Sequence, residues 1–221
     1  MLKKILITGC DGYIGWPFFL KTALKNKNYK IIGVDNFGRR KWVKEVKEKS
    51  FTKVYSFNER LKELKKISKR KNFRFINLDL TNYKKTSSLI KKFKPDIIFH
   101  LAAQPSAPYA NSNPQRATYT NYNNNQSTLN MLWALKKNNL LKTIFVETTT
   151  TGVYGTPDFN INEGFNILNK NPIPFHNLGG SWYHISKSND CNYLWLANRL
   201  WGLTVIDFRT AITLGLNTSE T

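Results

Sequence analysis

Short apolar runs alternate with longer amphipathic segments along this chain. The runs are compact and rich in β-branched residues, so they predict strands at about 4–8, 31–34, 73–78, 96–101, 143–147 and 204–208. Helical patterns fill the intervals, one up to about residue 25, a short one ending near 92, and long ones at 118–137 and 181–201. Strands separated by helices in this order predict an α/β fold with a parallel, doubly wound sheet flanked by helices.

The pattern contains neither an internal repeat nor a clear linker. A chain of 221 residues can bury a sizeable core, and we therefore predict one domain over 1–221. Two segments interrupt the alternation: a basic, mostly helical insertion at about 39–71, and a loop rich in Asn, Pro and Gly at 155–180.

Three glycines lie between the first predicted strand and the first helix. Gly9, Gly12 and Gly15 have the spacing G-x-x-G-x-x-G. At such a junction a dinucleotide pyrophosphate can bind the exposed N–H groups at the start of the helix. The alternative is an ordinary turn that happens to contain three glycines. The position directly after the first strand favours a dinucleotide site in a Rossmann-type domain.

Acidic residues end the next two predicted strands. A carboxylate at Asp35 would accept hydrogen bonds from the ribose hydroxyls of NAD and repel the 2′-phosphate of NADP. Arg39 and Arg40 lie close enough to be compatible with NADP as the cofactor, but Asp35 favours NAD. Asp79 ends the third strand, where contact with the adenine and a capping role in a turn are equally compatible with it.

Tyr183 and Lys187 are four residues apart on the last predicted helix and therefore share a face. A free tyrosine has a pKa of about 10, and a neighbouring ammonium lowers that pKa by stabilising the phenolate. The pair is a candidate general base. Taken alone, the spacing also fits a solvated helix face; the dinucleotide motifs upstream favour catalysis.

The charge of the chain is strongly positive, with 34 Lys and Arg against 14 Asp and Glu, a net charge of +20. A nucleic-acid or membrane surface would explain it, but no nucleic-acid-binding motif accompanies the charge. We favour a solvated, compositionally biased surface and expect neither a nucleic-acid partner nor a membrane span. Cys10 and Cys191 form no disulfide framework and no metal pattern, which indicates a reducing, cytoplasmic location.

Together these residues resemble the extended short-chain dehydrogenase/reductase family, whose members act on nucleotide sugars. The resemblance covers essentially the whole chain, and its motifs occur in the family's order. Besides the glycines, Asp35 and Tyr183-x-x-x-Lys187, they are Asp79-Leu80-Thr81, His100-Leu101-Ala102-Ala103-Gln104, Asn124-x-x-x-Thr128-x-Asn130, Thr150 four residues before Tyr154-Gly155, and Arg209.

The resemblance implies a role for each motif. It implies NAD binding by Gly9, Gly12, Tyr13, Ile14, Gly15, Asp35, Asn36, Asp79, Leu80, Leu101, Ala102, Ala103, Asn124, Tyr183 and Lys187. It implies substrate binding by Gln104, Ser106, Thr150 and Arg209. Catalysis falls to Thr150, Tyr183 and Lys187: bound NAD takes a hydride from C4 of the sugar while the tyrosine removes the hydroxyl proton. A proton relay and a structural role stay open for His184.

Within the family, several segments resemble the UDP-sulfoquinovose synthases, which favours a UDP-hexose as substrate. They are Ser106-Ala107-Pro108-Tyr109, Tyr154-Gly155-Thr156-Pro157, Asn162-Glu163-Gly164, Tyr183-His184-Ile185-Ser186-Lys187 and Thr218-x-Glu220-Thr221. Two positions depart from that pattern. Val153 replaces a carboxylate and Pro105 replaces a basic residue, which leaves epimerisation and dehydration open as outcomes of C4 oxidation. Glu147 and Glu163 are further acids whose placement the sequence leaves open.

Two more expectations follow from the resemblance. Family members form dimers through the helices that correspond to those carrying Thr128 and Tyr183, so we expect a homodimer. Family members also continue beyond the equivalent of Thr221, so we expect the substrate-binding region to be absent or incomplete in this sequence. A non-catalytic NAD-binding or RNA-associated module is the alternative from another class, and intact Thr150, Tyr183 and Lys187 argue against it.

Overall fold

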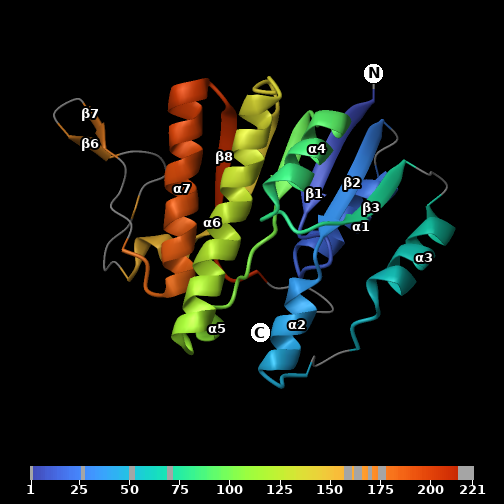
Figure 1. Ribbon diagram of the computed structural model, residues 1–221, viewed down its shortest axis with the longest axis horizontal. Coiled ribbons are helices and arrows are strands. Elements are labelled where there is room, and N and C mark those ends of the chain that lie inside the picture. The colour runs from blue at the N-terminus through green and yellow to red at the C-terminus, as the bar shows by residue number, and fades with distance from the viewer. Residues whose placement is uncertain are drawn as a thin grey trace.

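A six-stranded parallel sheet forms the centre of the molecule (Figure 1). The computed structural model describes residues 2–25, 28–49, 53–68, 72–156, 161, 166–168, 171–173 and 178–213. The strand order is β3-β2-β1-β4-β5-β8, the Rossmann order, which confirms the predicted fold class. The strands are β1 (Lys3–Thr8), β2 (Tyr29–Asp35), β3 (Phe73–Asn77), β4 (Ile97–His100), β5 (Ile144–Thr150) and β8 (Thr204–Thr210).

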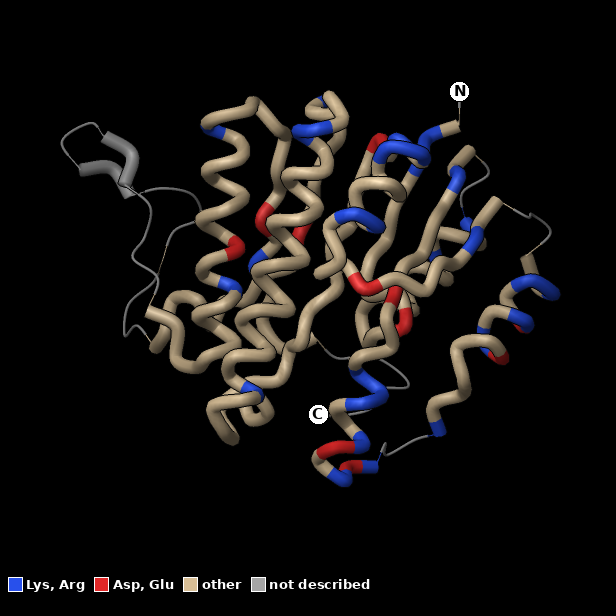
Figure 2. Tube along the Cα trace, viewed as in Figure 1, with Lys and Arg blue, Asp and Glu red and all other residues tan. Residues whose placement is uncertain are grey.

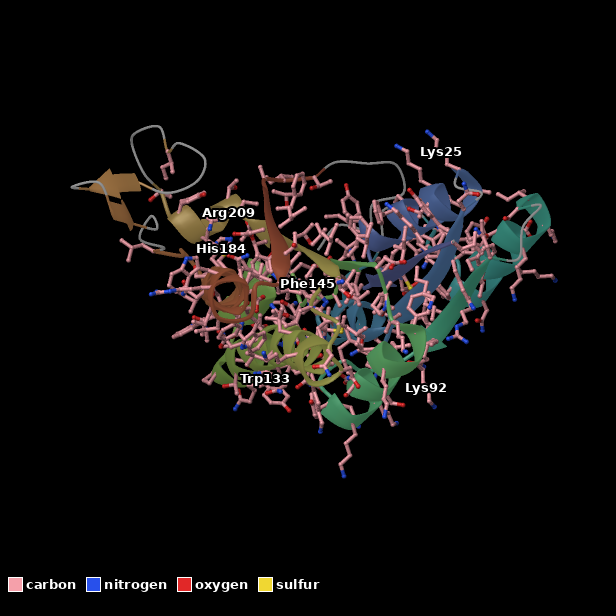
Figure 3. All side chains as sticks on the ribbon, turned by 90° about the horizontal axis from the view of Figure 1, so that it is seen from above. Lys25, Lys92, Trp133, Phe145, His184 and Arg209 are labelled. Carbon is pink, nitrogen blue, oxygen red and sulfur yellow. The ribbon has the colours of Figure 1, made fainter. Side chains whose placement is uncertain are left out.

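Helices cover both faces of this sheet, because successive strand residues point to opposite sides. Leu6 packs into a core with α4 (Tyr83–Phe93), α6 (Pro114–Lys137) and α7 (Trp182–Trp201), which lie side by side in Figure 1. Its neighbours Ile5 and Ile7 pack into a second core with α1 (Gly15–Lys25). Phe145 of β5 is fully buried in the first core, whereas Lys25 and Lys92 lie at the periphery (Figure 3).

Helix α6 begins at Pro114, earlier than the predicted start at residue 118. The Asn113 side chain accepts a hydrogen bond from the Arg116 N–H (2.9 Å), and proline follows at the first helical position, where its missing N–H costs nothing. A short helix that the pattern did not predict, α5 (Ala107–Asn111), precedes it and is capped by Ser106.

The other differences from the predicted elements lie around β5. This strand runs to Thr150 rather than ending at residue 147, because its last residues pair with β8 as far as Thr150 opposite Thr210. The loop predicted over 155–180 was wrong in part: β6 (Asn166–Leu168) and β7 (Asn171–Ile173) form an antiparallel pair.

The basic insertion is helical, as predicted, and contains α2 (Gly38–Glu45) and α3 (Phe57–Ile67). Ser56 and Glu59 form a capping box at the start of α3, each satisfying the other's backbone N–H. Lys and Arg occur along both helices and at scattered positions along the rest of the chain in Figure 2. Within the described ranges, no helix combines the length and the apolar character needed to cross a bilayer.

Candidate active site

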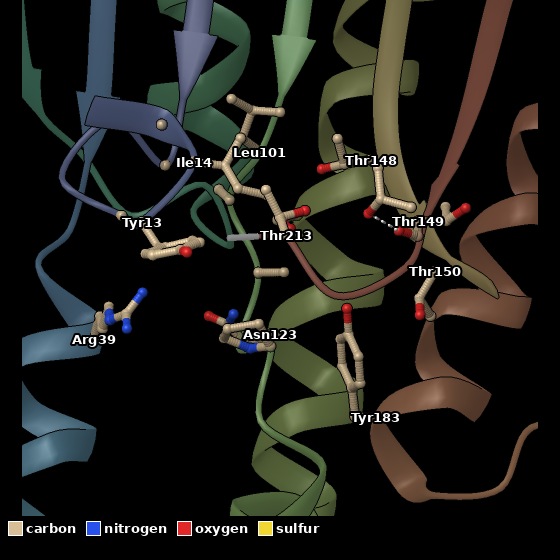
Figure 4. A pocket seen from close by; sticks show the side chains of 18 of the residues that line it. Tyr13, Ile14, Arg39, Leu101, Asn123, Thr148, Thr149, Thr150, Tyr183 and Thr213 are labelled. Atoms are coloured by element: carbon tan, nitrogen blue, oxygen red, sulfur yellow. Dashed lines mark hydrogen bonds between the residues drawn. The ribbon is translucent and has the colours of Figure 1, made fainter. Parts of the chain in front are cut away.

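A cavity of about 820 Å³ opens at the carboxyl ends of the parallel strands. Ligands of doubly wound sheets bind at this edge, where the strand order reverses between β1 and β4. The lining runs from the glycine turn and the end of β2 to the end of β5 and the start of α7. Figure 4 shows Tyr13 and Arg39 on one side of this space and Thr150 and Tyr183 on the other.

The turn between β1 and α1 brings Gly9, Gly12 and Gly15 to the cavity, together with Tyr13 and Ile14. Their binding of NAD stays a prediction. Gly9 has φ 69°, and a Cβ there would lie 2.6 Å from the Leu101 carbonyl oxygen of the neighbouring chain segment. A Cβ on Gly15 would lie 1.9 Å from the Gly9 carbonyl oxygen. The first and third positions therefore require glycine because backbone occupies the space of a side chain.

Asp35 and Asn36 reach the cavity at the end of β2. Both carboxylate oxygens of Asp35 accept backbone hydrogen bonds, from the N–H groups of Asp11 (2.8 Å) and Phe37 (2.7 Å). Burial raises the pKa of Asp35, and these two donors oppose that rise. Each oxygen keeps a second lone pair, so the carboxylate can still accept a ribose hydroxyl.

Asp11, inside the glycine turn, is a residue that the motif analysis missed. Arg40 of α2 donates two hydrogen bonds to its carboxylate (2.7 and 2.9 Å), and Arg60 of α3 donates a third. The carboxylate is nearly inaccessible to solvent. These hydrogen bonds connect the insertion to the glycine turn. Of Arg39, Arg40 and Arg60 in the insertion, Arg39 lines the cavity. The sequence contains a signal for this contact, namely an acidic residue inside the glycine turn followed by an insertion rich in Lys and Arg.

The ends of β3 and β4 supply the middle of the cavity. Asp79 and Leu80 line it beside Leu101, Ala102 and Ala103. Asp79 also accepts hydrogen bonds from the N–H (2.9 Å) and the hydroxyl (2.8 Å) of Thr81. The turn role considered for this residue is therefore present, and its contact with an adenine stays a prediction.

Thr150 and Tyr183 meet at the far end of the cavity (Figure 4). His184, next to Tyr183 in the chain, also lines the cavity. The Thr150 hydroxyl accepts a hydrogen bond from the Gly152 N–H (3.1 Å) at the start of a 3₁₀ turn. The expectation of a lowered tyrosine pKa was wrong for the free protein. Burial raises the pKa of Tyr183 and outweighs the Lys187 ammonium, which lowers it.

Lys187 lies behind the cavity wall rather than in the lining. Its ammonium donates to Glu147 Oε1 of β5 (2.7 Å) and to Asp190 Oδ2 of α7 (2.9 Å). All three side chains are at most 2% exposed. Burial lowers the pKa of Lys187, but the two carboxylates more than offset this and leave it well above its ordinary value.

Asn124, Gln104 and Ser106 also lie behind the wall. Asn124 Oδ1 accepts from the Gln104 N–H (2.7 Å), and its Nδ2 donates to the Gln104 carbonyl (3.1 Å) and to Ser186 Oγ (2.9 Å). The Gln104 side chain accepts from the Ser106 N–H (3.1 Å). The wall itself contains Asn123 and Ser127 of α6. Ser127 lies one turn after Asn124, a spacing that could have identified it.

Arg209 lies apart from the cavity as well. Its guanidinium donates to Asp207 (2.7 Å) and to the Tyr154 hydroxyl, although the next residues of β8 and beyond, Thr210 to Thr213, line the cavity. A substrate contact for Arg209 stays a prediction.

His184 packs its ring directly on Gly152. A Cβ on that glycine would lie 2.4 Å from His184 Nε2, so a larger residue at 152 would require the His184 ring to move from this position. His184 Nδ1 is buried and has no hydrogen-bond partner among the described residues. Burial lowers the pKa of His184, which favours the neutral imidazole.

The structure describes some, but not all, of the segments and positions that were compared with the UDP-sulfoquinovose synthases. Val153 is fully buried, and Pro105 lines the cavity. Pro157, the segment Asn162-Glu163-Gly164 and the segment Thr218–Thr221 lie outside the described residues.

Known proteins resemble this chain in sequence over nearly its whole length. A UDP-sulfoquinovose synthase from Sulfolobus acidocaldarius is 35% identical over 98% of the chain and 56% of the relative. The chloroplastic UDP-sulfoquinovose synthase of Spinacia oleracea is 31% identical over 99% of the chain and 45% of the relative. The chain thus spans about half the length of these curated relatives.

Solved structures resemble it in fold. The Bordetella bronchiseptica enzyme WbmH in complex with NAD+ is 25% identical to this chain, with a TM-score of 0.64. The match covers 100% of this chain and 60% of WbmH. The dTDP-glucose 4,6-dehydratase of Bacillus anthracis in complex with NAD is 21% identical over 97% of this chain and 56% of that one, with a TM-score of 0.68.

The family model described as GDP-mannose 4,6 dehydratase matches residues 6–174. That span contains the glycine turn, Asp35 and Thr150. With the sequence relatives, it confirms the resemblance predicted from the motifs: the chain belongs to the GDP-mannose 4,6 dehydratase family of extended short-chain dehydrogenases/reductases.

Proposed function

We propose that this chain binds NAD and contributes the redox site of an enzyme that transiently oxidises C4 of a UDP-hexose. The observation that carries the proposal is one continuous cavity with the glycine turn and Asp35 at one end and Thr150 and Tyr183 at the other. The residues present fit the cofactor, because Gly9, Gly12 and Gly15 line the cavity at the N-terminus of α1, where a pyrophosphate would bind backbone N–H groups.

Bound NAD supplies the hydride acceptor, and the chain's own residues supply binding and proton transfer. Tyr183 would take the proton of the C4 hydroxyl, and Thr150 would hold that hydroxyl by a hydrogen bond. Lys187 would stabilise the phenolate from behind the wall. Asp35 would hold the adenosine ribose at the opposite end of the cavity.

The reaction that follows oxidation is proposed from the relatives. Two UDP-sulfoquinovose synthases above 30% identity favour loss of water and addition of sulfite to the oxidised sugar. The buried Val153 and the cavity-lining Pro105 supply neither the carboxylate nor the base of that subfamily. A 4-epimerase, which needs no further acid, is therefore the second candidate.

The test is product analysis. Purified protein incubated with NAD and UDP-glucose is expected to give a new UDP-sugar by mass spectrometry, and the sulfonated product only when sulfite is present. An epimer with unchanged mass, separated by chromatography, would select the second candidate. Unchanged substrate across UDP-, GDP- and dTDP-hexoses would reject both.

Asp35→Asn is expected to weaken NAD binding by about tenfold and to narrow the preference for NAD over NADP. The amide keeps the shape of the carboxylate but loses one charged acceptor for the ribose hydroxyls and no longer repels a 2′-phosphate. Titration of both cofactors by calorimetry measures the ratio. Asp96→Asn, at the opposite end of the sheet beside the Lys4 N–H (2.7 Å), is the matched control. An unchanged ratio for the Asp35 variant would remove this residue from the cofactor site.

We also propose a cytoplasmic homodimer formed through α6 and α7. Large apolar side chains are exposed on these helices, among them Tyr122 (58%), Trp133 (51%) and Leu200 (63%). Light scattering in solution reports the mass directly, and a monomer at micromolar concentration would contradict the dimer.

A further inference from the structure

The Lys187 ammonium is held by two buried carboxylates, and each carboxylate is fixed by a second element. The Thr128 hydroxyl of α6 donates to Glu147 (3.2 Å), and Asn125 Nδ2 of the same helix donates to Asp190 Oδ1 (3.0 Å). The cluster therefore ties together β5, α6 and α7 directly behind Tyr183. Its geometry leaves the ammonium little freedom to move.

Burial and the neighbouring Glu147 raise the pKa of Asp190 to about 7, against the Lys187 ammonium and the Asn125 hydrogen bond, which lower it. Above that pH the charges in this cluster do not balance. One ammonium then faces two carboxylates, and Tyr183 and His100 of β4 are the other titratable groups near it among the described residues. Burial and the nearby ammonium lower the pKa of His100 to about 3, so the imidazole adds no positive charge at neutral pH. A structural ion pair needs only one carboxylate, and an additional buried negative charge is unfavourable. The second carboxylate therefore requires another explanation.

We propose that Glu147 and Asp190 are positioning residues that fix the Lys187 ammonium and offset its charge, so that Tyr183 keeps its proton in the free protein. This inference rests on the proposed function, in which Tyr183 is the base. Burial is the largest cause that raises the pKa of Tyr183; the ammonium lowers this pKa, and both carboxylates raise it further, which is the direction that the proposal requires. The positive nicotinamide ring of a bound NAD would then tip the balance toward the phenolate.

The test is a titration of the tyrosine itself. Protein labelled with ¹³C at the tyrosine Cζ is titrated by NMR, and the Tyr183 signal is assigned by its loss in Tyr183→Phe. Glu147→Gln and Asp190→Asn each remove one negative charge and retain an acceptor for Lys187, so one carboxylate still balances the ammonium. In both variants the titration midpoint of Tyr183 is expected to fall by at least about one pH unit, a tenfold rise in the acid dissociation constant.

The matched control is Glu63→Gln, which removes the same charge from an exposed pair with Lys66 on α3 and should leave the midpoint unchanged. A Tyr183 midpoint that stays at the wild-type value in the two cluster variants would overturn the proposal. Failure of both variants to fold would also overturn it, because a surplus carboxylate must be dispensable for folding. The titration uses neither cofactor nor sugar, so a shifted midpoint in a protein that converts no UDP-hexose would reject the proposed function alone.

Discussion

Tyr183→Phe is expected to lower turnover by about 10²- to 10⁴-fold while NAD still binds with wild-type affinity. The substitution removes only the hydroxyl, which is the group that would accept the substrate proton. The ring remains, so the packing at the start of α7 and the contact with the His184 ring, whose centroid lies 5.3 Å away, should persist. In this variant we therefore expect turnover to fall while the affinity for NAD stays unchanged.

Single-turnover formation of NADH, followed by absorbance after mixing with UDP-hexose, measures the chemical step, and calorimetry measures cofactor binding. Tyr193→Phe is the matched control, because Tyr193 lies on the same helix, packs against the core and does not line the cavity. Full activity in Tyr183→Phe would show that another group removes the proton. Loss of NAD affinity in parallel with activity would point to a binding role instead.

Gly9→Ala is expected to destabilise the fold by about 2–5 kcal/mol and to abolish NAD binding. Two costs add at this position. An alanine at φ 69° is strained by about 1–2 kcal/mol. In addition, the methyl group would meet the Leu101 carbonyl oxygen at 2.6 Å and the Ala102 nitrogen at 2.7 Å, and backbone at this strand end cannot move without disturbing β4.

The chain offers a control that separates these two costs. Gly202, at the end of α7, has φ 67° but nothing within 4 Å of its would-be Cβ. Gly202→Ala should therefore show the backbone strain alone, and its NAD binding should be unchanged. Urea denaturation gives both free energies of unfolding. Equal destabilisation of the two variants would mean that the close approach of the β4 segment contributes nothing.

The central strands β1 and β2 could be predicted because each is a compact apolar run, which reports burial on both faces. The edge strands β3 and β8 instead alternate apolar and polar residues and are mostly half-buried or exposed. The ends of elements could not be predicted. Thr148 to Thr150 extend β5 through backbone pairing with β8, which is independent of side-chain polarity. The first turn of α6, residues 114–117, is exposed or half-buried and shows no apolar periodicity, and the Asn113 cap rather than a hydrophobic pattern sets its start.

The site could be predicted where the chemistry is local in sequence. The glycine turn and the residues at the ends of β2 and β3 follow from spacing within one strand–helix unit. Of the two partners of Lys187, Glu147 could not be predicted, because it meets Lys187 across 40 residues of chain. Asp190 lies three residues after Lys187 on the same helix, a spacing that could have identified it. The direction of a side chain also cannot be predicted from the sequence. Gln104 and Pro105 are adjacent, yet of the two only the proline lines the cavity.

The seating of His184 on Gly152 has an evolutionary consequence. The two positions come from different elements, and the ring fills the volume that any larger residue at 152 would need. Substitution at either position alone should therefore be disfavoured, and the pair should covary among homologues: histidine at 184 with glycine at 152, and smaller residues at 184 wherever 152 carries a side chain. A histidine at 184 would thus be recognisable among homologues by its companion glycine at 152.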